Sequence, residues 1–188
     1  MAREVKKPRP KKCKACQVRF QPDRPLQEAC SPKCAIDLVR IKAEKKRKRQ
    51  DRERLKDLQP LSHWHSKAQA VFNEYIRLRD KDEPCISCGT KDAPQWCAGH
   101  YRSRGAAGHL RYNESNVHKQ CNHHCNQKLS GNIENYRVGL IKKIGVKAVE
   151  ALENNNVTKK WTREEIEEIR KKYSKMVKQL KKNISEDP

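Results

Sequence analysis

Eight cysteines arranged in four close pairs are the strongest constraint on how this 188-residue chain can fold. The pairs form two sets, and in each set a pair separated by two residues precedes a pair separated by three. Two such pairs make a tetrahedral zinc site with one knuckle from each pair. The sequence therefore predicts two structural zinc ions, with these ligands: Cys13, Cys16, Cys30 and Cys34 for one, and Cys85, Cys88, Cys121 and Cys125 for the other.

The net charge of +21 indicates a polyanionic partner, because Lys and Arg that neutralise phosphates supply most of the non-specific affinity for nucleic acid. The alternative is a soluble basic protein without such a partner. Only 35% of residues are hydrophobic and 36% are charged, so we expect small cores stapled by metal. Long apolar runs are absent, and we therefore expect no membrane partner and no secretory signal. Cysteines in such a chain are predicted to bind metal in a reducing compartment, the cytoplasm.

The composition divides the chain into four predicted parts. Residues 1–12 are basic and contain two prolines, which predicts a disordered arm. Residues 13–36 hold the first cysteine set and form an N-terminal zinc finger. Residues 37–60 are a basic helical linker with charged residues on all faces, either a solvated connector or an arm that follows DNA. Residues 61–188 form the main domain.

Helices are predicted in the main domain from apolar residues at helical spacing. The first has Ser62 as its N-cap, and the last begins with a capping box between Thr162 and Glu165. The apolar stripe of the last helix is expected to pack within the domain; the alternative is a dimer seam, which would make the protein a homodimer. The predicted ranges are 62–80, 132–144, 146–152 and 162 to the C-terminus. Opposite the apolar face of the first predicted helix lie Lys67, Arg77 and Arg79.

A histidine and two asparagines lie between and after the cysteines of the second set: His100, Asn116 and Asn126. This arrangement resembles the HNH (ββα-metal) endonucleases, as an H-N-N variant. The chain is also similar, over nearly its whole length, to the NinG (Rap) recombination endonucleases of lambdoid phages. The runs that carry this similarity are Gly-His-Tyr at 99–101, Leu-Arg-Tyr-Asn-Glu at 110–114, His-Lys-Gln-Cys at 118–121 and Leu-Ser-Gly-Asn at 129–132. The resemblance implies an α+β fold: a small zinc-stapled ββα-metal core flanked by helices.

The resemblance also implies a role for each of the three residues. His100 would be the general base that activates a water, and a neutral histidine with a pKa near 6.5 suits that role. Asn116 would hold the hairpin loop and orient His100. Asn126 would offer a carbonyl oxygen to a catalytic Mg²⁺ or Mn²⁺. Basic residues close to the three in sequence are expected to contact DNA phosphates: Arg102, Arg104, Arg111, Lys119 and Lys128.

Two features depart from the family pattern. Many HNH enzymes carry a second metal ligand directly before the catalytic histidine, where this chain has Gly99, and an acidic residue tends to stand at the position of Cys97. A thiolate is a poor ligand for Mg²⁺, so Cys97 weakens the site, shifts it toward softer metals, or plays no part. The second knuckle is one residue longer than usual, so His123 or His124 could replace a cysteine at the zinc. We favour Cys125, because the Asn-Gln-x-x-Ser-Gly-Asn sequence that follows stays in register with it.

The hypothesis that unites these patterns is a metal-dependent, structure-specific endonuclease, encoded by a phage or prophage. It would cut branched recombination intermediates such as Holliday junctions and D-loops. The nuclease chemistry comes from the residues, whereas the preference for branched DNA comes from the resemblance alone. The alternative is a non-catalytic, zinc-stapled DNA-binding protein with a degenerate HNH fold, which Gly99 and Cys97 favour. A restriction-type HNH enzyme would need a sequence-reading domain, and the sequence indicates none.

Overall fold

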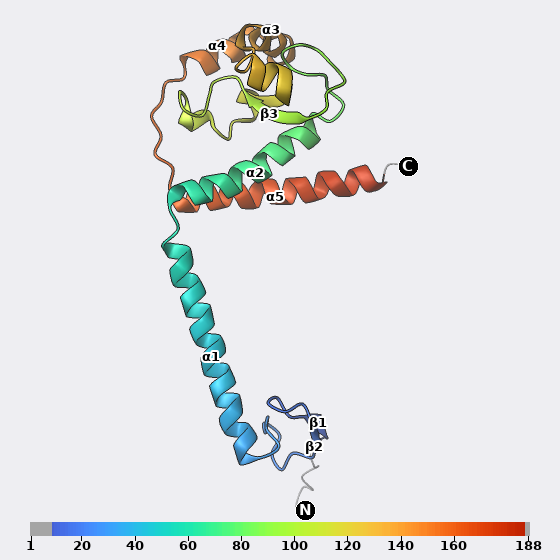
Figure 1. Ribbon diagram of the computed structural model, residues 1–188, viewed down its shortest axis with the longest axis vertical. Coiled ribbons are helices and arrows are strands. Elements are labelled where there is room, and N and C mark those ends of the chain that lie inside the picture. The colour runs from blue at the N-terminus through green and yellow to red at the C-terminus, as the bar shows by residue number, and fades with distance from the viewer. Residues whose placement is uncertain (1–8, 187–188) are drawn as a thin grey trace, which may run out of the picture. The chain divides into compact units, whose positions relative to one another are not determined.

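The structure is a computed structural model that describes residues 9–186 and divides into two compact units, Met1–Gln59 and Pro60–Pro188 (Figure 1). It combines helices with two small two-stranded sheets, which confirms the α+β class. None of the helices in the described range combines the length and the apolar character that a membrane span requires.

The N-terminal unit contains a very short hairpin, in which β1 (Lys11–Lys12) pairs antiparallel with β2 (Arg19–Phe20). This pairing corrects the end of the predicted disordered arm, because two of its lysines belong to a strand. Residues 1–8 of that predicted arm lie outside the described residues. The first cysteine knuckle lies between these two strands, where the Cys13 amide donates to the Val18 carbonyl at 2.9 Å.

The helix predicted to follow the second knuckle of this unit is confirmed as α1 (Pro32–Asp57). The Ser31 hydroxyl oxygen accepts a hydrogen bond from the Cys34 amide and so caps the first turn, and the proline sits where its missing amide hydrogen is not needed. Only Leu38 of this helix is buried. The helix is therefore held by its N-terminal attachment and not by a packed face.

In the C-terminal unit, α2 (Leu61–Arg79) and α5 (Arg163–Glu186) lie side by side (Figure 1). Their predicted apolar stripes are confirmed, and the rings of Phe72 and Tyr173 meet between them with centroids 4.8 Å apart. The capping box before α5 is also confirmed by reciprocal bonds. Because the apolar stripe of α5 packs against α2, it is covered within a single chain. The buried residues of this first cluster are Trp64, Ala68, Phe72, Tyr75, Ile76, Tyr112, Val117, Ile166, Tyr173 and Val177.

Two details predicted for α2 are wrong. The N-cap position belongs to Pro60, so Ser62 lies in the first turn, where it is exposed and caps nothing. Arg79 does not join the exposed basic face. Its guanidinium donates to the Asp80 carboxylate at 2.8 Å and to the Val117 carbonyl at 2.9 Å, and therefore ties the end of α2 to the adjacent strand.

The second hairpin pairs β3 (Trp96–His100) with β4 (Val117–Cys121) in antiparallel register. The connection between them includes two 3-10 turns, η1 (Gly108–Leu110) and η2 (Glu114–Asn116). β4 runs directly into η3 (Asn122–Lys128), a short helix with π-type turns. A π-turn is one residue wider than an α-turn, so η3 accommodates the longer second knuckle.

The two helices predicted after η3 are confirmed as α3 (Ile133–Ile144) and α4 (Val146–Asn154). Gly145 separates them with φ of +84°, a backbone conformation that glycine adopts without strain. Together with the loop after β3 they enclose a second hydrophobic cluster. Its buried residues are Tyr101, Ala107, Leu110, Tyr136, Leu140, Val149 and Leu152.

Candidate metal centres and candidate catalytic cavity

The first predicted cysteine set comes together in the N-terminal unit, where the four Sγ atoms lie within 4.8 Å of one another. The Sγ–Sγ distances are 3.6 Å from Cys16 to Cys30 and 3.6 Å from Cys30 to Cys34. A tetrahedral zinc with Zn–S bonds of about 2.3 Å places its sulfurs about 3.8 Å apart. The geometry of the cluster therefore fits a structural zinc ion.

The second set fits equally well in the C-terminal unit. Cys85 Sγ lies 3.7 Å from Cys121 Sγ and 3.9 Å from Cys125 Sγ. Backbone amides point at these sulfurs, including that of Cys121 toward Cys85 Sγ at 3.4 Å, as expected for thiolates. His123 and His124 are exposed and outside the set, so the structure groups Cys125, and neither histidine, with the other three cysteines. The chain could thus hold two structural metal ions.

The second metal centre joins three segments of the C-terminal unit. Cys85 and Cys88 lie in a tight turn closed by the bond from the Gly89 amide to the Cys85 carbonyl at 2.9 Å. Cys121 is the last residue of β4, and Cys125 lies inside η3. A metal bound here fixes η3 against the end of the hairpin.

His100 is the last residue of β3, opposite Val117 of β4. Its Nε2 lies 3.1 Å from the Arg111 carbonyl oxygen. Because a carbonyl only accepts, Nε2 carries the proton and Nδ1 keeps the lone pair in the neutral ring. Burial lowers the pKa of His100 to about 4, and the charge of Arg104 acts in the same direction. The expected pKa near 6.5 is therefore corrected downward, and the imidazole is neutral at physiological pH.

Asn116 is completely buried at the end of η2, directly before β4. Its Oδ1 accepts from the Arg102 amide at 2.8 Å, and its Nδ2 donates to the carbonyl oxygens of Arg102 and Leu110. The backbone carbonyl of Asn116 accepts from the Tyr101 amide. One side chain thus holds both ends of the loop that joins β3 to β4, with His100 at its start.

Asn126 lies on η3, where its Nδ2 donates to Asn122 Oδ1 at 3.1 Å. Asn126 and His100 line the same open cavity, which measures about 890 Å³ and which we call the His100 cavity. The hairpin and η3 thus bring two of the three predicted catalytic residues to one surface, and the third supports it from within. Other residues that line it include Asn73, Arg77, Gln95, Cys97 and Arg104.

The similarity to known proteins extends over nearly the whole chain. The family model described as Bacteriophage Lambda NinG protein matches residues 5–183. The chain belongs to the NinG family. It is 43% identical to Protein ninG of Escherichia phage 933W over 98% of that protein and 96% of this chain. It is 42% identical to Protein ninG of Escherichia phage lambda, over 98% of that protein and 96% of this chain. It is 41% identical to Protein ninG of Salmonella phage P22, over 96% of that protein and 94% of this chain. No solved structure shows significant similarity to the chain.

In this member of the NinG family, the position before His100 leaves no room for a side chain. A Cβ on Gly99 would lie 2.3 Å from Gln120 Oε1. The Gln120 amide is buried and donates to Ser87 Oγ and to the Gly131 carbonyl. Cys97 lines the His100 cavity, but burial raises the pKa of its thiol to about 12, so the sulfur carries no charge at neutral pH.

The five basic residues predicted to contact DNA have different surroundings. Lys119 is buried, and its ammonium donates to the Lys81 carbonyl at 2.7 Å, so it is a structural residue of the NinG fold. Arg102 is likewise engaged, with bonds to the carbonyl oxygens of Leu152 and Glu153. Arg104 is exposed at the His100 cavity, and Lys128 is exposed on η3. Arg111 lines a neighbouring cavity.

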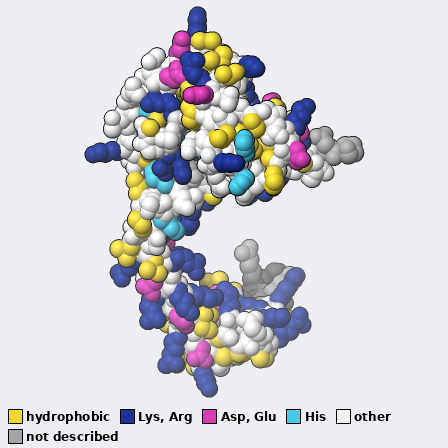
Figure 2. Space-filling model, turned by 45° about the horizontal axis from the view of Figure 1, so that its top comes forward, with side chains coloured by type: hydrophobic (Ala, Val, Ile, Leu, Met, Phe, Trp, Pro, Cys, Tyr) yellow, Lys and Arg dark blue, Asp and Glu magenta, His cyan; other side chains and the backbone are white. Residues whose placement is uncertain are grey.

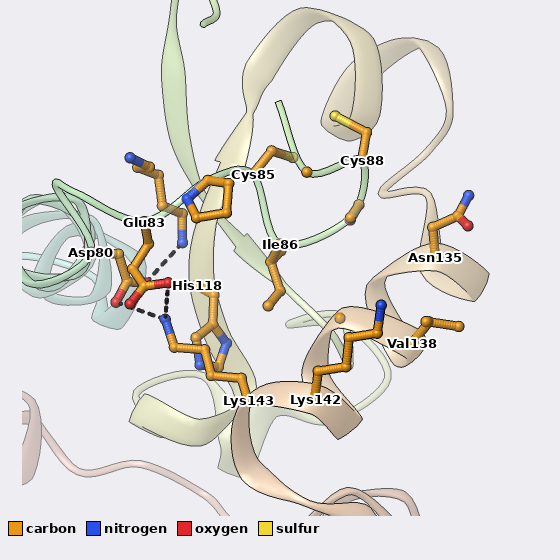
Figure 3. Close-up of a pocket in the computed structure, with 15 residues that line it drawn as sticks. Asp80, Glu83, Cys85, Ile86, Cys88, His118, Asn135, Val138, Lys142 and Lys143 are labelled. Atoms are coloured by element: carbon orange, nitrogen blue, oxygen red, sulfur yellow. Dashed lines mark hydrogen bonds and ion pairs between the residues drawn. The ribbon is translucent and has the colours of Figure 1, made fainter. Parts of the chain in front are cut away.

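A separate cavity of about 580 Å³ lies between the Cys85 turn and α3 (Figure 3). Its buried carboxylate, Asp80, accepts from Lys143 Nζ at 3.3 Å and from the Lys119 amide at 3.0 Å, in addition to Arg79. These bonds connect α2, β4 and α3. Sequence reasoning missed Asp80, since one acidic residue after a helix carries no signal of its own. It also missed Asn73, although Arg77, four residues later, was predicted on the same helical face.

Proposed function

We propose that this NinG protein is a metal-dependent endonuclease of HNH type that cuts branched DNA. The observation that carries the proposal is that His100 and Asn126 line the same cavity. The buried Asn116 holds the loop between β3 and β4, at the start of which His100 lies. The order of elements supports it as well, because an antiparallel strand pair is followed at once by a short helix, as the ββα-metal arrangement requires.

His100 acts as the general base in this mechanism. The hydrogen bond to the Arg111 carbonyl fixes the ring and its tautomer, and the Nδ1 lone pair takes a proton from the attacking water. Because its pKa is lowered to about 4, the ring is unprotonated across the neutral range. The rate contributed by this base rises as pH increases through the pKa and then becomes constant.

Asn126 would hold the catalytic cation through its amide oxygen, since the nitrogen is committed to Asn122. When bound, Mg²⁺ or Mn²⁺ supplies positive charge that stabilises the phosphorane-like transition state and the leaving 3′ oxygen. Arg104 at the same cavity adds a positive charge for the substrate phosphate. Lys and Arg side chains are spread over the visible faces of both units and suit a phosphate backbone (Figure 2).

One observation favours the second candidate, a non-catalytic DNA-binding protein. The Gln120 side chain occupies the place where many HNH enzymes carry their second metal ligand, beside Gly99. The weaker metal site that results would lower the affinity for Mg²⁺. The two candidates differ in whether any divalent cation supports cleavage.

The deciding experiment incubates the full-length, zinc-loaded protein with a four-way junction, a D-loop and a linear duplex, in Mg²⁺, Mn²⁺ or EDTA. His100→Ala should reduce junction cleavage by roughly 10²–10⁴-fold and leave zinc content and junction affinity unchanged. The matched control is His124→Ala, because His124 is exposed and lies outside both the metal set and the His100 cavity. Wild-type cleavage by His100→Ala would refute this mechanism, and an inactive wild type with every cation would favour the second candidate.

A further inference from the structure

We propose that a cavity beside the His100 cavity binds an unpaired nucleotide next to the scissile phosphate, with its phosphate on Arg104 and Arg111 and its base edge on Gln69. This flanking cavity measures about 600 Å³ and lies between the first half of α2 and the segment after β3. It shares Asn73 and Arg104 with the His100 cavity, so the two are adjacent. The inference rests on the proposed endonuclease function and extends it to the part of the substrate that is recognised.

Two buried polar atoms on residues that line the flanking cavity have no hydrogen-bond partner. Gln69 is only 5% exposed; its Nε2 donates to Asn73 Oδ1, whereas its Oε1 accepts nothing. Arg111 Nε is buried and donates to nothing. Unpaired buried polar groups are rare in folded proteins and indicate a missing partner. A ligand that paired with both atoms would offer an acceptor to Arg111 and a donor to Gln69.

The charges that line the flanking cavity select an anion. None of the described residues that line it is acidic, and two of them are arginines. His65 adds no charge at neutral pH, because burial and the nearby Arg111 both lower its pKa while its Nδ1 pairs with the Tyr112 hydroxyl at 2.9 Å. A phosphate oxygen is the acceptor that guanidinium groups bind best in a nucleic acid.

The remaining requirement, a donor for Gln69 Oε1, is met by the N–H groups on the Watson–Crick edge of a base. That edge is free only when the base is unpaired. A nucleotide held in this way has its phosphate beside Arg104, at the boundary with the His100 cavity. Arg111 also connects the two cavities, since its carbonyl accepts from His100 Nε2. An unpaired nucleotide at a branch point would therefore place the adjoining phosphate in front of the general base.

The experiment measures binding of a linear duplex, a duplex with a single-stranded flap and a four-way junction of matched sequence. The full-length, zinc-loaded protein carries His100→Ala so that no probe is cut. Gln69→Leu should weaken flap binding by about tenfold and leave duplex binding within about twofold. Arg111→Gln should weaken flap binding similarly and lower the slope of log Kd against log salt by about one. Matched controls on the exposed face of α5, Gln179→Leu and Lys171→Gln, should bind like the parent.

Zinc content and thermal melting establish that each variant is folded, and Arg111→Met replaces Arg111→Gln if the latter is not. Flap binding at the parent level by folded Gln69→Leu and Arg111 variants would overturn the inference. The same variants with wild-type His100 separate the two proposals. If they cut and bind like wild type, the flanking cavity is excluded and the endonuclease stands. If wild type cuts nothing while Gln69→Leu still loses flap binding, the endonuclease fails and the nucleotide site stands.

Discussion

The N-terminal and C-terminal units carry four-cysteine sites with the same spacing within each cysteine pair, yet the two sites differ in what surrounds the sulfurs. In the described part of the N-terminal unit, the buried residues are Cys13, Pro22, Ala29 and Leu38. The C-terminal unit has two hydrophobic clusters besides its cysteines. A metal ion in the first site therefore substitutes for a core, whereas in the second it adds to one.

Chelation of both metals should give the largest loss of stability, and the loss should be greater in the N-terminal unit than in the C-terminal unit. The N-terminal unit should unfold from its hairpin to the first turn of α1, because structural zinc contributes about 10 kcal/mol or more and little else is buried. α2 and α5 should stay paired through their aromatic core. Hydrogen exchange with and without a strong chelator tests this. Equal loss of protection in α2 and in the hairpin would contradict it.

Removal of an aromatic ring from the core should destabilise the C-terminal unit and leave the N-terminal unit unchanged. Phe72 is fully buried between Tyr112 and Tyr173, so Phe72→Ala should destabilise the C-terminal unit by about 3–5 kcal/mol. The control is Ile36→Ala on the exposed side of α1, which should change nothing measurable. Denaturant unfolding followed by tyrosine fluorescence reports the C-terminal unit. A shift below about 1 kcal/mol would show that the metal, not the core, holds this unit.

The buried carboxylate Asp80 should matter less than the ring but more than any surface ion pair. Burial opposes its charged form, but the hydrogen bond from Arg79 and the charge of Lys143 outweigh burial and hold its pKa below the ordinary value. Asp80→Asn should cost about 3 kcal/mol, since it leaves buried donors without a charged partner. This stability is present above pH of about 4 and is lost as pH falls through the lower folded pKa. Acid unfolding of wild type and variant measures it.

The smallest effect is expected from Glu28, the corresponding carboxylate of the N-terminal unit. Lys14 and Lys42 lower its pKa to about 2 by hydrogen bonds, but all three side chains are in contact with solvent. Solvent and salt screen such pairs. Glu28→Gln should therefore shift the melting of this unit only slightly at low salt and not at all in concentrated salt. A shift that survives high salt would show that this unit depends on more than its metal.

The features predictable from sequence are those fixed by local spacing. The cysteine sets, the bounds of α3, and the capping box at Thr162 follow from neighbours within a few residues. Lys119 and Arg79 could not be placed in this way. Both carry charges that suggest exposure, and both are directed inward by partners far away in sequence, Lys81 and Val117.

Resemblance to the HNH pattern selects His100, Asn116 and Asn126 from the sequence as candidate site residues, but it says nothing of their surroundings. Gln69 belongs to no motif, and Gln120 was noted only as a member of the His-Lys-Gln-Cys run. Their importance arises because folding brings Gln120 against Gly99 and leaves Gln69 with an unpaired oxygen. Sequence patterns record which residues recur at a spacing, whereas an unpaired buried atom exists only in three dimensions.

The adjacency of Cys125 and Asn126 on η3 has a consequence for how accurately the proposed cation can be positioned. Successive Cα atoms are about 3.8 Å apart across a rigid, planar peptide. Asn132 Nδ2 donates to Cys125 Sγ, and a metal bound to this sulfur would fix it further. Asn126 could then move only by rotation about the few bonds that separate it from Cys125. The position of the Asn126 amide oxygen is thus determined largely by the position of the Cys125 thiolate. An insertion between these two residues would move the oxygen by a full residue step without disturbing the zinc ligands.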